Sequence, residues 1–350
     1  MIDFNKYTFP EKGTAREALL LINKIAIPNM ALFIVNENKQ LIGSLTDGDI
    51  RRGFLKGLTI DSPVSDFMNP TSKCFVDGEN NFEKVKKYKD AGMRFIPVIN
   101  ANKLIVRVID LDKVRSIIPA DAILMAGGMG ERLKPLTNSV PKPMLKIGEK
   151  PIIIRNIERL ANYGISNFHI SVRHMAEEIE RGINEQKFEN ASLNFVKEDK
   201  PLGTIGSVKL IKEFVNDTIL LMNSDILTNI DFHDFYKKFV ESGSDMVVAT
   251  VPYHIDVPYA IMDINDKNIV TSFSEKPRYT YYSNAGIYLF KKELINLIPD
   301  NDAFDATHFM EAVIANEKKL TSYPILGYWL DIGRVEDYYK AQEDVKHIYF

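Results

Sequence analysis

The sequence predicts an α/β protein whose larger, C-terminal part is built on a mixed, mostly parallel sheet. The first observation is a continuous apolar run at 122–126, a pattern typical of a strand buried on both faces of a parallel sheet. The second is a downstream alternation of short strands with helical segments of about 10 to 15 residues, which is typical of βαβ units. The third is a separate, repeated α/β pattern in the first 118 residues, which predicts a smaller preceding module.

The N-terminal part, residues 1–118, carries one pattern twice. A predicted helix is followed by two short apolar strands that a polar turn joins into a hairpin. The same order returns about 60 residues later, and two copies at this period favour a pair of fused modules over a solenoid. The expected segments are a helix over 15–25 with strands over 31–35 and 41–45, then a helix over 82–91 with strands over 95–99 and 104–109.

The C-terminal part, residues 119–350, begins at Pro119 and has room for a domain of ordinary size. Beyond about residue 245 the pattern becomes richer in strands, which predicts a mixed edge of the sheet that carries part of a substrate site. The expected strands before that point cover 122–126, 168–172, 193–196 and 219–222, and the expected helices cover 152–163, 175–186 and 205–214.

The composition indicates a globular protein with a sizeable core, because 45% of the residues are hydrophobic and 26% are charged. A net charge of −3 gives no general attraction to nucleic acid or anionic membranes, so phosphate binding would depend on local basic clusters. The single cysteine, Cys74, excludes an internal disulfide and is typical of a reducing compartment. Without a signal-peptide pattern or a membrane-spanning apolar segment, the sequence predicts a cytoplasmic protein.

A glycine-rich loop follows the first strand of the C-terminal part. Gly127, Gly128 and Gly130 would let backbone N–H groups approach an anion closely. No register of this segment gives the P-loop pattern. A dinucleotide fingerprint would need a third glycine where Leu133 stands, so that class is also excluded, and with it an NAD-dependent oxidoreductase.

Two basic residues accompany this loop. Arg132 lies just beyond the glycines, and Lys142 lies between two prolines that hold it on a stiff, extended stretch. A guanidinium that grips oxygens in pairs and an ammonium that acts as a point charge are what a triphosphate requires. The six histidines form no pair at metal-binding spacing, so no zinc site is predicted.

The run Gly-Gly-x-Gly-x-Arg-Leu-x-Pro-Leu-Thr over 127–137, followed by Pro-Lys-Pro over 141–143, resembles the signature of the sugar-1-phosphate nucleotidyltransferases. That family includes glucose-1-phosphate thymidylyltransferases and mannose-1-phosphate guanylyltransferases. The resemblance extends over 120–346 and implies a Rossmann-like, GT-A-like fold. It also implies a Mg²⁺-dependent reaction in which a nucleoside triphosphate and a sugar 1-phosphate give a nucleotide sugar and pyrophosphate.

The resemblance implies a role for each matching residue. Arg132 would stabilise the pyrophosphate, Lys142 the α-phosphate, and Lys276 the sugar phosphate. The further matches are Gly127, Gly128, Gly130, Gly203 and Thr204 for the nucleotide, Glu275, Asn284 and Gly286 for the sugar, and Asp225 and Asp331 for the metal.

Purely structural interpretations of five of these residues are left open. Asp225 is also typical of a turn or cap, and Thr204 of a helix cap. Glu275 and Lys276 are also typical of an exposed ion pair, and Asp331 of an N-cap for a helix beginning at residue 334.

The N-terminal segment 43–50 resembles the Gly-h-h-Thr-x-x-Asp stretch of CBS domains. That resemblance implies that Thr46 and Asp49 contact the ribose of an adenine nucleotide. The second copy departs from the pattern, because aligning Asp112 with Asp49 puts Ile109 in the place of Thr46. Two roles are open for the tandem CBS pair, nucleotide sensing and subunit pairing, and both predict a homodimer or higher oligomer.

A CBS pair ahead of a short nucleotidyltransferase is similar to the glucosamine-1-phosphate guanylyltransferases of bacterial legionaminic-acid synthesis. This domain order favours GTP and glucosamine 1-phosphate as substrates. Mannose-1-phosphate guanylyltransferase, or another nucleotide-hexose pyrophosphorylase, is the alternative within the family. A non-catalytic nucleotide-sugar sensor is the alternative from a different class, although Arg132, Lys142 and both aspartates are present.

Overall fold

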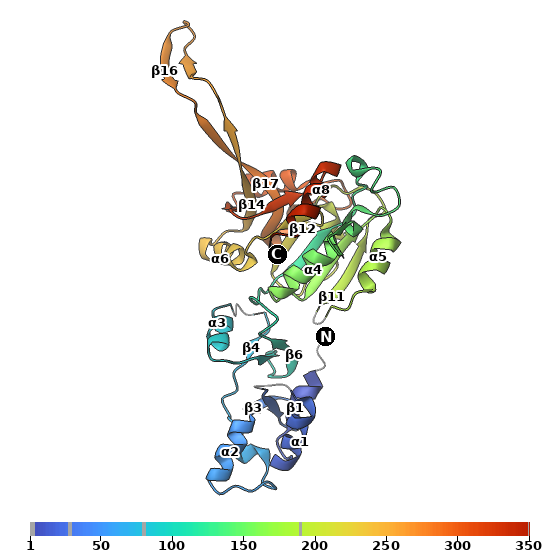
Figure 1. Ribbon diagram of the computed structural model, residues 1–350, viewed down its shortest axis with the longest axis vertical. Helices are drawn as coiled ribbons and strands as arrows, with labels where there is room; N and C mark the ends of the chain where they lie inside the picture. Colours follow the sequence, from blue (N-terminus) through green and yellow to red (C-terminus); the bar gives the residue numbers. More distant parts are fainter. Residues whose placement is uncertain (1–3, 27–29, 79–81, 189–190, 349) are drawn as a thin grey trace. The chain divides into compact units, whose positions relative to one another are not determined.

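The computed structural model describes residues 4–26, 30–78, 82–188, 191–348 and 350 (Figure 1). The chain forms two compact units. Unit 1 comprises Met1–Asp121, Ile157–Phe168 and Asn184–Asn194, and unit 2 comprises Ala122–Asn156, His169–Ile183 and Phe195–Phe350. Among the described residues, no helix combines the length and the apolar character that crossing a membrane requires.

Unit 1 contains two three-stranded sheets of the same design. In each sheet the first two strands are parallel and the last two are antiparallel. The predicted repeat of helix, strand, turn and strand is therefore confirmed. The first copy comprises β1 (Thr8–Pro10), α1 (Ala15–Ile25), β2 (Leu32–Val35), β3 (Leu41–Leu45) and α2 (Asp47–Leu55), and the second comprises β4 (Phe75–Val76), α3 (Phe82–Asp90), β5 (Phe95–Ile99) and β6 (Ile105–Asp110).

The helices of the first copy begin at capping boxes. Thr14 accepts a hydrogen bond from the Glu17 amide while the Glu17 carboxylate accepts one from the Thr14 amide, and this fixes the start of α1. Thr46 and Asp49 make the same reciprocal bonds at the start of α2. The buried side chains of β2 and β3, such as Leu32 and Leu45, contribute to the core of this copy.

A seven-stranded sheet, most of which belongs to unit 2, has the order β11-β10-β7-β12-β17-β14-β18 and is mixed and mostly parallel. β17 runs antiparallel to both of its neighbours, and β14 runs parallel to β18. The strands are β7 (Asp121–Met125), β10 (Asn167–Val172), β11 (Ser192–Lys197), β12 (Thr218–Asn223), β14 (Met246–Asp256), β17 (Arg278–Lys291) and β18 (Leu320–Pro324). The predicted mixed edge of the sheet is therefore confirmed.

Helices pack against this sheet around a core of large apolar side chains, including Ile123, Leu221 and Phe290 (Figure 1). The helices are α4 (Ile152–Asn162), α5 (Ala176–Asn184), α6 (Phe232–Ser242), α7 (Ala306–Ala315) and α8 (Val335–Asp344).

The helix predicted over 205–214 is wrong, because only a 3-10 turn, η5 (Gly206–Leu210), is present. The amides of Ile205 and Gly206 both donate to the Phe304 carbonyl, at 3.0 and 3.2 Å. A tertiary backbone contact therefore fixes the start of this segment, which continues only as the short 3-10 turn.

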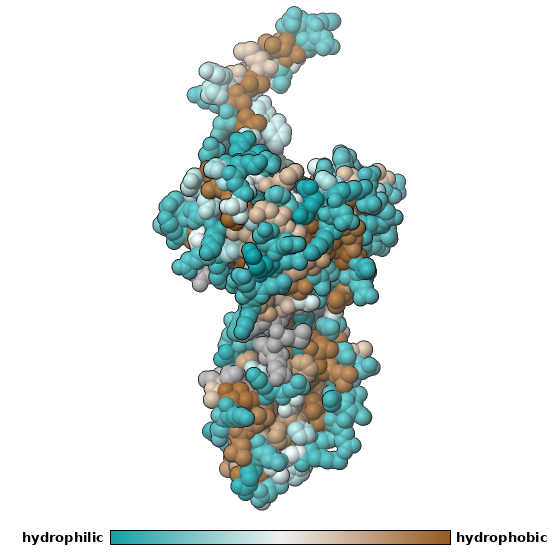
Figure 2. All heavy atoms as spheres, turned by 90° about the vertical axis from the view of Figure 1, so that its right-hand side faces the viewer, coloured by the Kyte–Doolittle hydropathy of each residue, from teal (hydrophilic) through white to brown (hydrophobic). Residues whose placement is uncertain are grey.

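The strands β14 and β17 continue past the sheet as a two-stranded ribbon (Figure 1). A small antiparallel pair, β15 (Ile261–Ile264) and β16 (Val270–Ser274), forms its tip. We call residues 252–283 the arm. Its side chains are mostly exposed, and hydrophobic residues are visible along it in Figure 2.

Candidate active site

A cavity of about 250 Å³ lies where β7 and β12 end in unit 2. The carboxyl ends of neighbouring strands in open α/β sheets are where ligands bind. Here β7 leads into the glycine loop and β12 leads into Ser224 and Asp225. The residues that line the cavity are Met125, Ala126, Gly128, Gly130, Glu131, Arg132, Lys142, Pro143, Ser224, Asp225 and Gly333.

Two short strands bring Asp225 and Asp331 together. β13 (Ile226–Thr228) pairs antiparallel with β19 (Trp329–Asp331), and Ile226 is the register partner of Asp331. The amide of Ile332 donates to the Asp225 carbonyl at 3.1 Å. The two predicted metal-binding carboxylates are therefore neighbours, although about 100 residues separate them in the sequence. Asp331 lies in a strand, so it is not the N-cap of the following helix.

Lys142 reaches this pair from the other side of the cavity. It begins a 3-10 turn, η4 (Lys142–Met144), directly after Pro141, and it forms an ion pair with Asp225. Both side chains are largely buried, at 15% and 17% exposure, so water screens their attraction less than at the surface.

The pKa of Asp331 is raised to about 6. Burial is the largest cause, followed by the negative charge of Asp225, while Lys142 and Arg132 act in the opposite direction. Burial and the neighbouring carboxylate therefore make Asp331 harder to ionise than a free aspartate, in spite of the two cations.

The donor set fits a hard divalent cation. Asp225 Oδ1 is buried and has no hydrogen-bond partner in the part of the chain that the structure describes. An unsatisfied buried carboxylate oxygen is costly unless a ligand completes it. Within the same described ranges, no three His, Cys, Asp or Glu residues are grouped as metal ligands. Mg²⁺ prefers a site in which two carboxylates bind it and phosphates and water occupy its other coordination positions.

The glycine loop approaches the cavity with little side-chain bulk. Gly130 has φ +66°, and a Cβ atom there would lie 2.9 Å from Thr137 Cγ2 and 3.1 Å from Lys142 Cβ. Gly128 has open space where its side chain would be, and this leaves room for a ligand. A Cβ at Gly333 would lie 3.7 Å from an Arg132 guanidinium nitrogen and 3.6 Å from an Asp331 oxygen. The loop, Arg132 and the aspartate pair therefore surround one space.

Two buried residues support this arrangement and were not singled out from the sequence. Asn156 on α4 donates to the Ser224 carbonyl at 3.1 Å and so holds the turn that carries Asp225. Glu198 accepts hydrogen bonds from the Ser171 hydroxyl and the Leu202 amide, and one of its oxygens lies next to Gly127. Neither residue belongs to a local motif. The one signal in the sequence that could have indicated them is a polar residue after an apolar segment, where burial is expected.

Gly203 and Thr204 do not line the cavity. Gly203 has φ +74°, and a Cβ atom there would lie 2.6 Å from the Phe304 carbonyl oxygen. The Thr204 hydroxyl accepts from the Ala306 amide at 2.7 Å and so caps α7 from outside that helix. The structure gives both residues a packing role, and their contact with the nucleotide stays a prediction.

Asn284 and Gly286 lie where β17 leaves the core of the sheet. Asn284 donates to the Tyr288 hydroxyl at 2.8 Å and accepts from the Gly286 amide at 2.9 Å. Gly286 has φ +70°, and a Cβ atom there would lie 2.7 Å from the Asn223 side chain. Gly286 thus lets β17 approach the end of β12 closely, and the sugar contact of both residues stays a prediction.

Glu275 and Lys276 lie on the arm with exposed side chains, and neither is among the described residues that line the cavity. Lys276 has a left-handed backbone, with φ +46°. The structure does not bring these two residues to the aspartate pair of the same chain.

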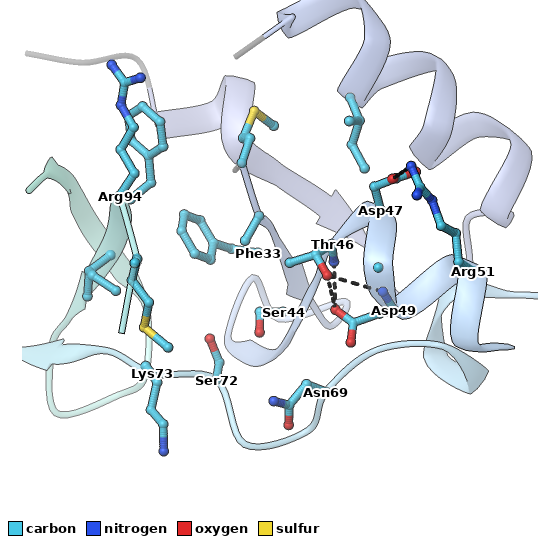
Figure 3. Close-up of a pocket in the computed structure, with 18 of the residues that line it drawn as sticks. Phe33, Ser44, Thr46, Asp47, Asp49, Arg51, Asn69, Ser72, Lys73 and Arg94 are labelled. Atoms are coloured by element: carbon cyan, nitrogen blue, oxygen red, sulfur yellow. Dashed lines mark hydrogen bonds and ion pairs between the residues drawn. The ribbon is translucent and has the colours of Figure 1, made fainter. Parts of the chain in front are cut away.

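Thr46 and Asp49 line a separate pocket of about 980 Å³ within unit 1 (Figure 3). Their polar atoms bond to each other, with the Thr46 hydroxyl 2.6 Å from Asp49 Oδ2. Arg51 and Arg52 pair with Asp47 and Asp49. Ser72 and Lys73 line the opposite wall, and Ser72 Oγ is buried without a partner among the described residues (Figure 3).

Residues 121–347 match the family model described as Nucleotidyl transferase. The match covers well over half of the chain. The protein belongs to the nucleotidyl transferase family. Members of this family generally use a divalent metal ion, in agreement with the paired aspartates of the cavity.

Two curated relatives from the family illustrate its range. A mannose-1-phosphate guanyltransferase of Saccharomyces cerevisiae is 32% identical over 230 residues, which are 62% of this chain and 62% of that protein. A UTP–glucose-1-phosphate uridylyltransferase of Synechocystis sp. is 29% identical over 239 residues, covering 63% of this chain and 62% of the relative. The chain thus spans less than two thirds of the length of these relatives.

Among solved structures, HddC from Yersinia pseudotuberculosis is similar to this chain. It is 29% identical with a TM-score of 0.50, and the match covers 65% of this chain and 99% of HddC. A complex of the same protein with GMP-PN gives 27% identity and a TM-score of 0.50.

Proposed function

We propose that this protein transfers a nucleoside monophosphate from a nucleoside triphosphate to a sugar 1-phosphate and releases pyrophosphate. The observation that carries the proposal is the geometry of the cavity, where Asp225, Lys142 and Arg132 lie beside the glycine loop, with Asp331 next to Asp225 although it is not among the lining residues. Family membership and sugar-phosphate nucleotidyltransferase relatives support the same reaction.

In this reaction an oxygen of the sugar phosphate attacks the α-phosphorus in line, and the bond from that phosphorus to pyrophosphate breaks. The attacking oxygen is already anionic, so the site needs no strong general base. The obstacle is the approach of two polyanions, which positioned positive charge overcomes. Lys142 would neutralise the α-phosphate, and Arg132 with the backbone N–H groups of the glycine loop would hold the leaving pyrophosphate.

Asp225 and Asp331 would hold the metal ion, for which Mg²⁺ is the proposal because both donors are hard carboxylate oxygens. Such an ion would neutralise phosphate charge and orient the reacting phosphates. In the structure Lys142 is paired with Asp225. A bound cation would take over part of that pairing and leave the Lys142 ammonium for substrate.

GTP is the favoured nucleotide in this proposal. Support comes from the mannose-1-phosphate guanyltransferase relatives and from the HddC complex with GMP-PN. Glucosamine 1-phosphate is the favoured sugar, on the resemblance in domain order to the legionaminic-acid enzymes. Mannose 1-phosphate and glucose 1-phosphate, the substrates named for the relatives, are the alternatives.

For the N-terminal part we propose a tandem CBS-type module at 1–118, ahead of the catalytic domain at 119–350. Its two matching sheets and the pocket that contains Thr46 and Asp49 support this assignment. The module would bind an adenine nucleotide or pair subunits, and the proposal includes a homodimer or higher oligomer in the cytoplasm.

The test is pyrophosphate release with Mg²⁺ across five nucleoside triphosphates and a panel of sugar 1-phosphates. Release with GTP and glucosamine 1-phosphate alone would support both the reaction and its specificity. Release with another pair would keep the reaction and contradict the guanylyl assignment. Without release for any pair, while the protein still binds nucleotides, the reaction would be contradicted and a sensor role favoured.

A further inference from the structure

The arm is a ribbon with two different faces. Cross-strand partners share a face, and the face alternates along each strand. On one face Tyr253 is opposite Tyr281 and Ile255 is opposite Tyr279. On the other face Pro252 is opposite Tyr282, His254 bonds Thr280 at 3.0 Å, and Asp256 pairs with Arg278. Beyond the pair of Pro252 with Tyr282 the ribbon is therefore amphipathic, and its side chains are mostly exposed.

The tip repeats this design. Met262 is opposite Phe273, and Ile264 is opposite Val270, so these four apolar side chains share one face. The apolar side chains of ribbon and tip are between 41% and 72% exposed. Monomeric proteins rarely leave so much contiguous apolar surface in water, and an isolated two-stranded ribbon is marginally stable at best. The apolar faces of the arm therefore indicate a partner.

The arm also carries a residue that the proposed active site lacks. The walls of the cavity supply Arg132 and Lys142 for the triphosphate, and no further cation among its lining residues is left for the sugar phosphate. Lys276, the predicted cation, lies beyond the last register pair of the ribbon, Asp256 with Arg278. That pair is six residues from the pair of Thr250 with Asn284, which at ~3.3 Å per residue is about 20 Å.

We propose that the arm of one chain docks on the nucleotidyltransferase unit of a second copy and delivers Lys276 to that copy's sugar-phosphate site. The inference rests on the proposed function and adds that each active site is shared between two chains. Lys276 would be the cation for the sugar phosphate, and Glu275, its neighbour, would face the sugar. Both side chains are exposed and therefore accessible to a second copy.

A second copy is the occupant that the geometry favours. The ribbon carries Lys276 away from its own Asn284, so an intact straight ribbon can only bring it to another chain. Eight apolar side chains, each about half exposed, present on the order of 700 Å² per arm, close to one partner's share of a standard interface. Reciprocal exchange about a two-fold axis buries both arms in one closed assembly.

Paired inactive variants test the proposal. Chains carrying Lys142→Ala and chains carrying Lys276→Ala are co-expressed with different tags, and the heterodimer is isolated by two affinity steps. If the arm acts on the second copy, one of the two sites has an intact wall and an intact arm. We expect about half the pyrophosphate release of the wild-type dimer, whereas each homodimer releases almost none.

The matched control pairs wild-type chains with chains that carry both substitutions. Arms that cross leave no intact site in this heterodimer, so we expect almost no release. Arms that act on their own chain give the reverse result, with about half the release here and almost none in the first heterodimer, and that outcome overturns the proposal. A Lys276→Ala homodimer with the wild-type rate overturns it as well.

Hydrogen–deuterium exchange separates failure of this inference from failure of the proposed function. Association should slow deuterium uptake in peptides from 252–283 as the protein concentration rises, whatever the reaction. Wild-type protein that releases no pyrophosphate but shows this protection contradicts the function and retains the docking. Uptake that does not change across concentrations at which the mass shifts from monomer to dimer overturns the docking.

Discussion

The two pockets of this protein use similar residues in opposite ways. In the unit 2 cavity, Asp225 leaves a buried oxygen unsatisfied among the described residues, and Asp331 has a raised pKa. In the unit 1 pocket, Thr46 and Asp49 satisfy each other and begin α2. The first pocket concentrates groups that need a ligand, and the second uses its polar pair to hold the fold. Substitutions in the first should therefore affect activity, and those in the second should affect stability.

The largest effect should come from Lys142→Ala. The substitution removes the ammonium that faces the aspartate pair, and we expect turnover to fall by at least about a hundredfold, which is the scale for one preorganised electrostatic contact. Steady-state pyrophosphate release gives the rate, and circular dichroism checks the fold. Lys146→Ala, an exposed lysine that does not line the cavity, is the matched control and should keep the wild-type rate. Equal rates for the two variants would remove Lys142 from the mechanism.

The second effect is a loss of activity in acid that magnesium should reverse. Asp331 has a pKa of about 6 in the metal-free protein, and its protonated form is a poor metal ligand. We expect kcat/KM at low Mg²⁺ to fall as the pH drops through about 6, approaching tenfold per pH unit. Since metal and proton compete for the carboxylate, raising the Mg²⁺ concentration should move the midpoint to lower pH. A midpoint that is independent of Mg²⁺ would contradict the assignment of Asp331 as a ligand.

A smaller effect, on stability, is expected in the other pocket. Thr46→Ala removes the side-chain oxygen that caps α2, which should lower the free energy of unfolding by about 1 kcal/mol. Thermal unfolding followed by circular dichroism measures the loss. Thr46→Ser, which keeps the hydroxyl, is the control and should retain most of the stability. A Thr46→Ala protein as stable as the wild type would mean that this pair is free to serve a ligand, and the contrast between the pockets would fail.

Local signals account for what the sequence could predict. The bounds of α1 and α4, the glycine loop and the proline-bracketed Lys142 follow from residues within one turn or strand. Long-range contacts account for the rest. Asn156 with Ser224, and Glu198 with Ser171, act across sequence separations that no local pattern encodes. At 205–214, where the sequence predicts a helix, the hydrogen bonds of the Ile205 and Gly206 amides to Phe304 also join residues far apart in the sequence.

The arm shows the same limit on a larger scale. Its strands alternate as ordinary sheet strands do, so the pattern of β14 and β17 predicts strands but not where the sheet ends. The resemblance of residues 274–277 to a sugar-binding segment gives a role without a position. Only the strand register of the ribbon shows that Lys276 lies far from the cavity of its own chain.

The smallest expected effect is a gain in stability, which is not the result usually expected of an active-site substitution. In metal-free protein, Asp331→Asn removes a charge that burial and Asp225 make unfavourable. The folded-state pKa of about 6 lies above the usual value of 3.8, so the folded state binds more protons between these values, and stability falls as the pH rises through that window. Above pH 6 the penalty is fully present in wild type and absent in the Asn variant. Because Asp331 is only partly buried, solvent screening reduces the gain to about 1 kcal/mol.

Thermal unfolding in a chelator at pH 8 and pH 5 measures this gain. The Asn variant should melt above wild type at pH 8, and the difference should shrink at pH 5, where wild-type Asp331 is largely protonated. Saturating Mg²⁺ should reverse the order, because only the wild type gains stability from a ligand that its folded state binds. A variant that melts below wild type at pH 8 without metal would mean that Asp331 supports the fold, as Thr46 does. The cavity would then be a structural cluster and not a site prepared for a cation.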